Sequence, residues 1–242
     1  MRFSRCSWPV IGIILALLAL AGLRPVPGRA AEPVWGGAPQ GHQVAITFDD
    51  GPSPLYTPKI LAVLKRYHAR ATFFIVGSHA EQYPWIVREL LQAGNEVGNH
   101  SFSHPHLTKT DQNTRELELE RTALDLDLLG KPGGHPLFRP PYSQYDHRLL
   151  SYLDHTHRRL VLWSIDSGDW RGLPAGAIVQ NVLPKVHPGA IIIFHDADEN
   201  EKADRRPTIA ALETIIPALQ AAGYRLVTVS ELLAAPQPKP SL

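Results

Sequence analysis

Short runs of apolar residues recur along most of the chain, separated by stretches with the periodicity of amphipathic helices. The runs, which predict β-strands, span residues 43–48, 71–76, 95–98, 136–139, 159–165, 189–194 and 224–229. The stretches between them, which predict helices, span residues 57–68, 80–93, 111–129, 146–155, 174–186 and 207–222. Strand and helix in alternation are typical of parallel βα units, so the pattern predicts an α/β domain of about seven units.

This alternation continues without an internal repeat or a second domain. Continuous apolar runs such as 190–194 suit strands that are covered on both faces, which favours a barrel or a large open sheet. In the predicted helix 111–129 we expect the stripe of Leu117, Leu124 and Leu128 to face the core.

The first 31 residues follow another pattern. Arg2 and Arg5 precede an apolar run over 10–23, and prolines and small residues follow it. This is the layout of an export signal, and the run is shorter than the ~20 residues that a membrane-spanning helix needs. We therefore expect a cleaved signal peptide, with an uncleaved N-terminal anchor as the alternative. The expected divisions are a signal or anchor over 1–31, a linker over 32–41, the folded domain over 42–235 and a loose tail over 236–242.

Composition narrows the class of partner. The chain has 242 residues, of which 44% are hydrophobic and 19% charged, with a formal net charge of +1. These values are ordinary for a globular protein and give no electrostatic reason to expect a nucleic acid. Cys6, the single cysteine, precedes the apolar run, so the exported domain would depend on its core and not on disulfides.

Candidate chemistry begins where the first predicted strand ends, at Asp49 and Asp50 before Gly51. Two acids that share a cavity are costly unless a cation or a proton separates their roles, so this pair predicts a metal. His100 and His104 are four positions apart, a spacing that places both on one face of a helical turn. Two imidazoles and one carboxylate make an open site that keeps positions for water, as hydrolysis requires.

Five segments together resemble the motifs of polysaccharide deacetylases of carbohydrate esterase family 4, in the same order. They are TFDDGP at 47–52, HSFSHP at 100–105, RPPY at 139–142, DSGDW at 166–170 and IIIFHD at 191–196. The resemblance covers roughly 42–233 and implies a distorted, TIM-barrel-like (β/α) barrel and a metal-dependent removal of acetyl groups from sugars, usually N-acetylglucosamine. Ser143 and Ile193 depart from the family pattern, where Gly and Leu are usual.

The resemblance also implies roles for the site residues. Asp50, His100 and His104 would hold a divalent metal, for which Zn²⁺ is expected, although Co²⁺, Mn²⁺ or Ni²⁺ fits a similar site. Asp49 would be the general base, and Arg139 would orient it.

A second proton-handling group is required because an amine leaves poorly unless it is protonated. His195 would supply that proton, with Asp169 favouring its charged form. Tyr142 would offer its backbone N–H to the oxyanion, and its ring and Trp170 would wall the acetyl pocket. Ile193 and Pro141 complete the predicted substrate-binding residues, and we expect Asp196 to cap or turn the chain.

The resulting hypothesis is an exported bacterial N-deacetylase that acts as a monomer on a polysaccharide or oligosaccharide, secreted, periplasmic or bound to the cell envelope. It would contact a membrane only through an uncleaved N-terminal segment. Peptidoglycan, chitin-type glycans and exopolysaccharide all stay open as substrates. The alternatives are an O-acetyl esterase acting on xylan or a similar glycan and a catalytically silent glycan-binding wall protein. The presence of every proposed metal and proton-transfer residue argues against the second alternative.

Overall fold

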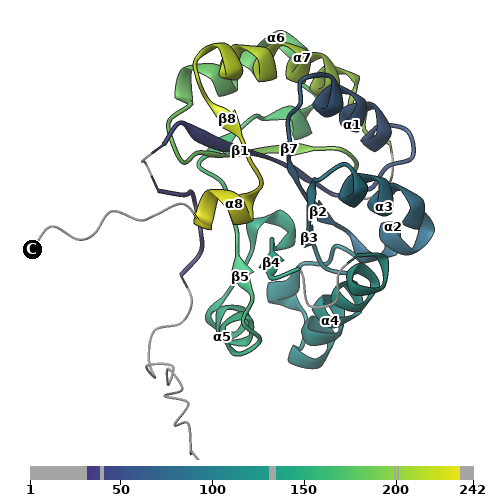
Figure 1. Cartoon of the computed structure of the whole chain (residues 1–242). Coiled ribbons are helices and arrows are strands. Elements are labelled where there is room, and N and C mark those ends of the chain that lie inside the picture. Colours follow the sequence, from purple (N-terminus) through teal and green to yellow (C-terminus); the bar gives the residue numbers. More distant parts are fainter. Residues whose placement is uncertain (1–31, 39–40, 131–134, 199, 201, 235–242) are drawn as a thin grey trace, which may run out of the picture.

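The computed structural model describes residues 32–38, 41–130, 135–198, 200 and 202–234. Its strands are all parallel and form one curled sheet with helices around its outer side (Figure 1). The strands are β1 (Gln43–Asp49), β2 (Thr72–Ile75), β3 (Glu96–Asn99), β4 (Leu137–Phe138), β5 (Arg159–Leu160), β6 (Ile165–Asp166), β7 (Ile191–His195) and β8 (Arg225–Leu226). Their order is β5-β4-β3-β2-β1-β7-β6, and β8 pairs with the start of β1. The expected distorted (β/α) barrel is confirmed.

Most expected helices are present near the expected bounds. They are α1 (Thr57–Arg66), α2 (Gly77–Gln82), α3 (Pro84–Gln92), α4 (Gln112–Leu129), α5 (His147–His155), α6 (Ala175–Val182), α7 (Arg206–Ala221) and α8 (Val229–Ala234). The single helix expected over 80–93 is two helices, because Pro84 has no N–H to continue the first one and suits the first turn of the next. Among the helices of the described residues, none is long and apolar enough to cross a membrane.

The apolar run 159–165 is not one strand, as expected, but two. β5 pairs with β4, whereas β6 pairs with β7 at the other edge of the sheet. The residues between them cross from edge to edge, and of these Val161, Leu162 and Trp163 are buried or half-buried whereas Ser164 is exposed. Because apolar side chains continue into the crossing, the hydrophobic pattern does not reveal where the chain changes partner.

The segment expected as a linker is part of the folded domain wherever it is described. Val34 exchanges backbone hydrogen bonds with Leu160 and Leu162 at 2.8 and 2.7 Å, and the Gly37 N–H donates to the Gly189 carbonyl at 2.8 Å. The segment thus lies between the end of β5 and the start of β7. The boundaries expected for residues 1–31 and 236–242 fall outside the described residues.

Alternation along β1 decides which side chains reach the interior of the barrel. Ile46 and Phe48 pack on the outer side, in a cluster that includes residues of α1 and α7. Ala45 joins the inner cluster, and Thr47 and Asp49 follow on the same side of the strand. The last residue of β1 therefore presents its carboxylate to the inside of the barrel, at the carboxyl end of the strands.

The leucine stripe on α4 does not face the core, which corrects the expectation. Leu117, Leu124 and Leu128 are 69%, 59% and 73% exposed. In α4 leucines alternate with acidic residues, so they are distributed around the helix and only one row of side chains is buried. That row comprises Arg115, Leu119, Thr122 and Leu126.

Candidate active site

The acidic pair stands in a turn that brings both carboxylates to one histidine. Asp50 has a φ of 74°, a left-handed conformation that reverses the chain after β1. Asp50 Oδ1 lies 3.4 Å and Asp49 Oδ2 3.8 Å from Nε2 of His100. The two acids therefore share one cavity, as the sequence predicts.

The two histidines converge on Asp50 from the loop after β3. Nε2 of His104 lies 3.2 Å from Asp50 Oδ1, and one ligand atom from each of the three residues lies within 4.8 Å of the others. The expected helical turn is wrong, since the loop is non-helical and both Ser101 and His104 have positive φ. Pro105 disfavours right-handed helical geometry at the residue before it, and Ser101 Oγ accepts the His104 N–H instead.

The orientation of His100 suits a metal ligand. Its Nδ1 lies 2.7 Å from the carbonyl of Arg139, which only accepts, so Nδ1 carries a proton and Nε2 is the nitrogen directed toward the acids. Burial alone would raise the pKa of Asp50, but contacts with His100 and His104 hold this pKa well below its ordinary value. Two imidazole nitrogens and a carboxylate thus form a donor set that fits Zn²⁺ or a similar ion.

Arg139 fixes Asp49 from inside the barrel. Its guanidinium is fully buried and donates to Asp49 Oδ1 at 2.7 Å and to Thr47 Oγ1 at 2.8 Å. Two further N–H groups donate to the carbonyls of Val161 and Leu162, and the group lies 4.0 Å above the Phe74 ring. Burial lowers the pKa of Arg139, and the charge of Asp49 opposes that shift. Oδ1 of Asp49 is held in this way, and Oδ2 is directed toward His100.

A second pair occupies the end of β7. His195 is the register partner of Asp49 on the neighbouring strand, and its Nδ1 lies 2.8 Å from Asp169 Oδ1. Burial alone would lower the pKa of His195, but the charge and hydrogen bond of Asp169 raise it to about 9. His195 is therefore an imidazolium at neutral pH, with a proton on each ring nitrogen.

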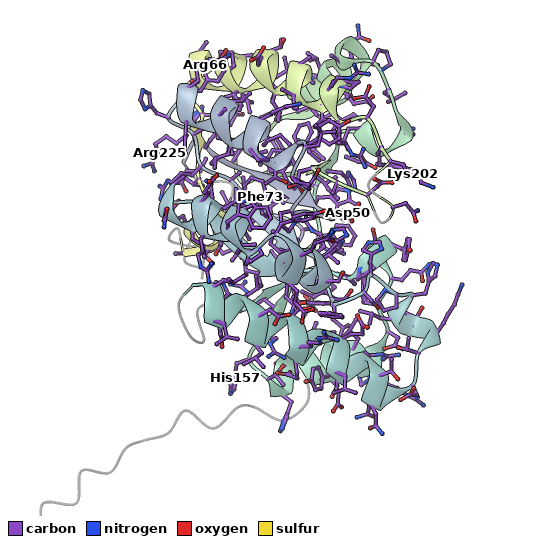
Figure 2. The ribbon with its side chains drawn as sticks, turned by 90° about the vertical axis from the view of Figure 1, so that its right-hand side faces the viewer. Asp50, Arg66, Phe73, His157, Lys202 and Arg225 are labelled. Carbon is purple, nitrogen blue, oxygen red and sulfur yellow. The ribbon has the colours of Figure 1, made fainter. Side chains whose placement is uncertain are left out.

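One cavity of about 630 Å³ is lined by Asp49, Asp50, His100, His104 and His195, whereas Arg139 and Asp169 are buried and do not line it. Figure 2 shows Asp50 on the same side of the molecule as Lys202, whereas Arg66 and Arg225 lie on the opposite side. The cavity thus opens at the carboxyl ends of the strands, as in other βα barrels. Of the expected substrate-binding residues, Tyr142, Trp170 and Ile193 line it, whereas Pro141 does not and its neighbour Pro140 does.

The strained turn at Tyr142 is braced by two imidazole rings. Tyr142 and Ser143 both have positive φ, at 56° and 58°, so Ser143 adopts the left-handed conformation without being a glycine. The His106 ring stacks on Tyr142 with centroids 4.0 Å apart, and His104 packs edge-on at 4.7 Å. Sequence reasoning does not single out His106, since no spacing links it to Tyr142.

Further residues support the His195–Asp169 pair, and sequence reasoning does not single them out. Asp169 Oδ2 accepts the His195 N–H and the Thr208 hydroxyl, both at 2.9 Å, and Arg205 donates to the Asp169 carbonyl at 3.3 Å. Thr208 and Arg205 belong to the start of α7, where no motif marks them. A pairing of this kind depends on the fold and leaves no local signal.

Asp196 was expected to cap or turn the chain, and the structure buries its carboxylate completely. The Thr57 hydroxyl donates to it, and it lies against Gly51, where a Cβ would come within 2.2 Å of it. Burial raises the pKa of Asp196 to about 7, and the charge of Asp50 adds to that shift. It therefore supports the turn that carries Asp50.

Known proteins share both sequence and fold with this chain. Residues 36–161 match the family model described as polysaccharide deacetylase. A peptidoglycan-N-acetylglucosamine deacetylase of Bacillus cereus is 39% identical over 194 residues, which are 78% of this chain and 87% of that protein. A chitooligosaccharide deacetylase of Azorhizobium caulinodans is 34% identical over 76% of this chain and 90% of its own length. The crystal structure of a peptidoglycan N-acetylglucosamine deacetylase bound to a substituted benzamide superposes with a TM-score of 0.80, at 33% identity, over 85% of this chain and 94% of that one.

Proposed function

The chain belongs to the polysaccharide deacetylase family, and we propose that it hydrolyses the N-acetyl group of N-acetylglucosamine units in a bacterial envelope glycan, releasing acetate. One observation carries this proposal. A metal-ligand set, a carboxylate beside it and an imidazolium on the neighbouring strand all face one cavity. Amide hydrolysis needs these three components: activation of water, acceptance of its proton and protonation of the leaving amine.

Asp50, His100 and His104 would hold a divalent ion, for which we propose Zn²⁺. Such an ion lowers the pKa of water from 15.7 toward about 7 and polarises the carbonyl of the acetyl group. The hydrogen bond at Nδ1 of His100 directs its Nε2 toward the proposed ion, and the low pKa of Asp50 keeps that residue a carboxylate, as a cation requires.

Asp49 is the proposed general base. Its Oδ1 is bound to Arg139, so Oδ2 is the oxygen that accepts the proton of the attacking water. The buried guanidinium fixes the carboxylate in one orientation and keeps its second oxygen toward the ligand set. Arg139 thus acts on the reaction through Asp49.

His195 is the proposed general acid. Asp169 accepts the hydrogen bond from its Nδ1, so the proton on Nε2 is the one that passes to the leaving nitrogen. We propose that the Tyr142 N–H stabilises the oxyanion and that Tyr142, Trp170 and Ile193 enclose the acetyl methyl group.

An acetate-release screen tests this function. The protein, loaded with Zn²⁺, is assayed on peptidoglycan, chitin oligomers, an N-acetylglucosamine exopolysaccharide and acetylated xylan, with and without a chelator. We expect release from at least one of the N-acetylated glycans, its loss on chelation and its return when Zn²⁺ or Co²⁺ is added. Release from xylan alone would make the protein an O-acetyl esterase, and full activity after chelation would contradict the mechanism.

We also propose that the protein acts outside the cytoplasm. The positively charged start and apolar run of residues 1–31 support export, and the envelope glycan named for its relatives agrees with it. Fractionation of cells that express the full chain tests this, together with N-terminal sequencing of the exported protein. Cleavage near residues 28–31 is the expected result.

A further inference from the structure

Three successive carbonyls of the turn after β1 accept hydrogen bonds from three different parts of the fold. The carbonyl of Asp49 accepts from the backbone at the end of β7, at 3.2 Å, and the carbonyl of Gly51 from the backbone after β2, at 2.9 Å. The middle carbonyl, that of Asp50, accepts from a side chain, since Nδ1 of His79 lies 2.8 Å from it. A carbonyl only accepts, so His79 carries its proton on Nδ1.

The middle bond matters because of the backbone at Asp50. A positive φ is uncommon for a residue other than glycine and persists only where its surroundings hold it. His79 is 9% exposed, so water has little access to take the place of its N–H. The bond fixes the peptide that follows Asp50, and with it the direction in which the carboxylate leaves the chain.

Helix α2 connects this turn to the histidine loop. The N–H groups of Gly77 and Ser78 donate to the carbonyls of Ser101 and Phe102, at 3.0 and 2.9 Å. The next residue along α2 is His79, which reaches the other half of the ligand set. Three consecutive residues of α2 therefore bind both the turn that carries Asp50 and the loop that carries His100 and His104. They fix the separation between these two segments.

We propose that His79 is a positioning residue for the metal ligand Asp50, and that its Nδ1–H bond sets the affinity of the site for the ion. This inference rests on the proposed function, because it assumes that Asp50 is a ligand. A cavity of about 50 Å³ lies between His79, Asp50 and His104. The turn has room to move into this cavity when the imidazole is removed.

The test compares the Zn²⁺ affinity of variants of the full chain, by competition with a chromogenic chelator. His79→Leu removes the donor and keeps the bulk, whereas His79→Asn places an amide N–H where Nδ1 stood. We expect His79→Leu to weaken Zn²⁺ binding by about 10–100-fold and His79→Asn to stay within about threefold of the wild type.

A matched control uses another histidine that donates to a carbonyl. Nδ1 of His135 lies 3.3 Å from the Val97 carbonyl, near the start of β3 and thus away from the carboxyl ends of the strands. His135→Leu should leave the Zn²⁺ affinity unchanged. At saturating Zn²⁺, His79→Leu should regain most of the wild-type rate of acetate release, because the variant keeps both proposed proton-transfer groups, Asp49 and His195.

The outcomes separate the two proposals. Wild-type affinity in a folded His79→Leu variant overturns the positioning role and leaves the proposed function intact. If His79→Leu does not fold, His79→Asn decides, since a folded Asn variant that binds Zn²⁺ tenfold or more weakly contradicts the role of the Nδ1–H bond. A wild-type protein that binds Zn²⁺ no better than His100→Ala would instead overturn the proposed metal site.

Discussion

Asp49 and Asp50 are neighbours in the chain with different surroundings, which predicts different losses on mutation. Asp49 is bound by Arg139, whereas Asp50 lies between two imidazoles. We expect Asp49→Asn to keep its metal and lose about 10²–10⁴-fold in kcat, since an amide does not accept the proton of water. His100→Ala should lose the metal itself. Zinc content and acetate release are measured on the same samples, and a parallel loss of both in Asp49→Asn would make Asp49 a ligand.

The Asp169–His195 pair predicts the direction of a shift in the pH–rate profile. With a pKa of about 9, His195 keeps its proton across neutral pH and loses it as the pH rises through that value. Asp169→Asn removes the charge that raises this pKa, so activity should fade at lower pH on the alkaline side while the acid limb moves little.

The measurement is kcat/KM against pH for variants loaded with the same metal. Equal loading is needed because the charges of Asp49 and Asp50 also raise the pKa of His195, and a bound cation counters them. Asp154→Asn, an exposed carboxylate on α5, is the control and should not move either limb. An alkaline limb that stays in place in Asp169→Asn would mean that Asp169 only shapes the pocket.

Residues within the motifs could be proposed for the site from the sequence because they stand at the ends of recognisable apolar runs and resemble the motifs of a known family. The supporting residues could not. His79 bonds to a residue 29 positions away, Arg205 to one 36 positions away and Thr208 to one 39 positions away. Such contacts arise only when separate βα units meet at the carboxyl ends of the strands, and no local pattern encodes them.

At the scale of elements, the apolar runs predict where strands lie but not how the strands pair. The bounds of β1 agree with the first apolar run to within one residue, whereas the run 159–165 divides between two strands at opposite edges of the sheet. Helix α4 shows the same limit, because a regular alternation of leucine and acid has no helical period and does not define a buried face.

Helix α4 therefore predicts that equivalent leucines differ in their contribution to stability. Leu126 is fully buried, whereas Leu124, two positions earlier, is 59% exposed. We expect Leu126→Ala to reduce the free energy of unfolding by about 2–5 kcal/mol and Leu124→Ala to change it by less than about 0.5 kcal/mol. Urea unfolding of the two variants checks this. A comparable loss in both would show that the exposed leucines are covered in solution.

On the scale of the whole molecule, the segment before β1 is packed against the last helix. A Cβ on Gly37 would lie 2.6 Å from Cγ and 2.9 Å from the carbonyl oxygen of Leu232 in α8. Gly37→Val should therefore lower the free energy of unfolding by about 1–3 kcal/mol through overpacking. Gly176→Ala in α6, where nothing lies within 4 Å of the new Cβ, should raise it by up to about 1 kcal/mol. An unchanged stability of Gly37→Val would mean that this segment does not pack on α8 in solution.

Metal binding should stabilise the whole domain, because the proposed ligands come from βα units that meet only in the folded state. Asp50 follows β1 and His100 follows β3, so the unfolded chain does not offer the set together. At free Zn²⁺ of 100 times the dissociation constant, linkage predicts about 2.7 kcal/mol of added stability, or about 5–10 °C in Tm for a domain of this size. Thermal unfolding over a range of Zn²⁺ concentrations measures the shift, and His100→Ala should remove it. A Tm that rises equally in His100→Ala would place the stabilising ion elsewhere in the protein.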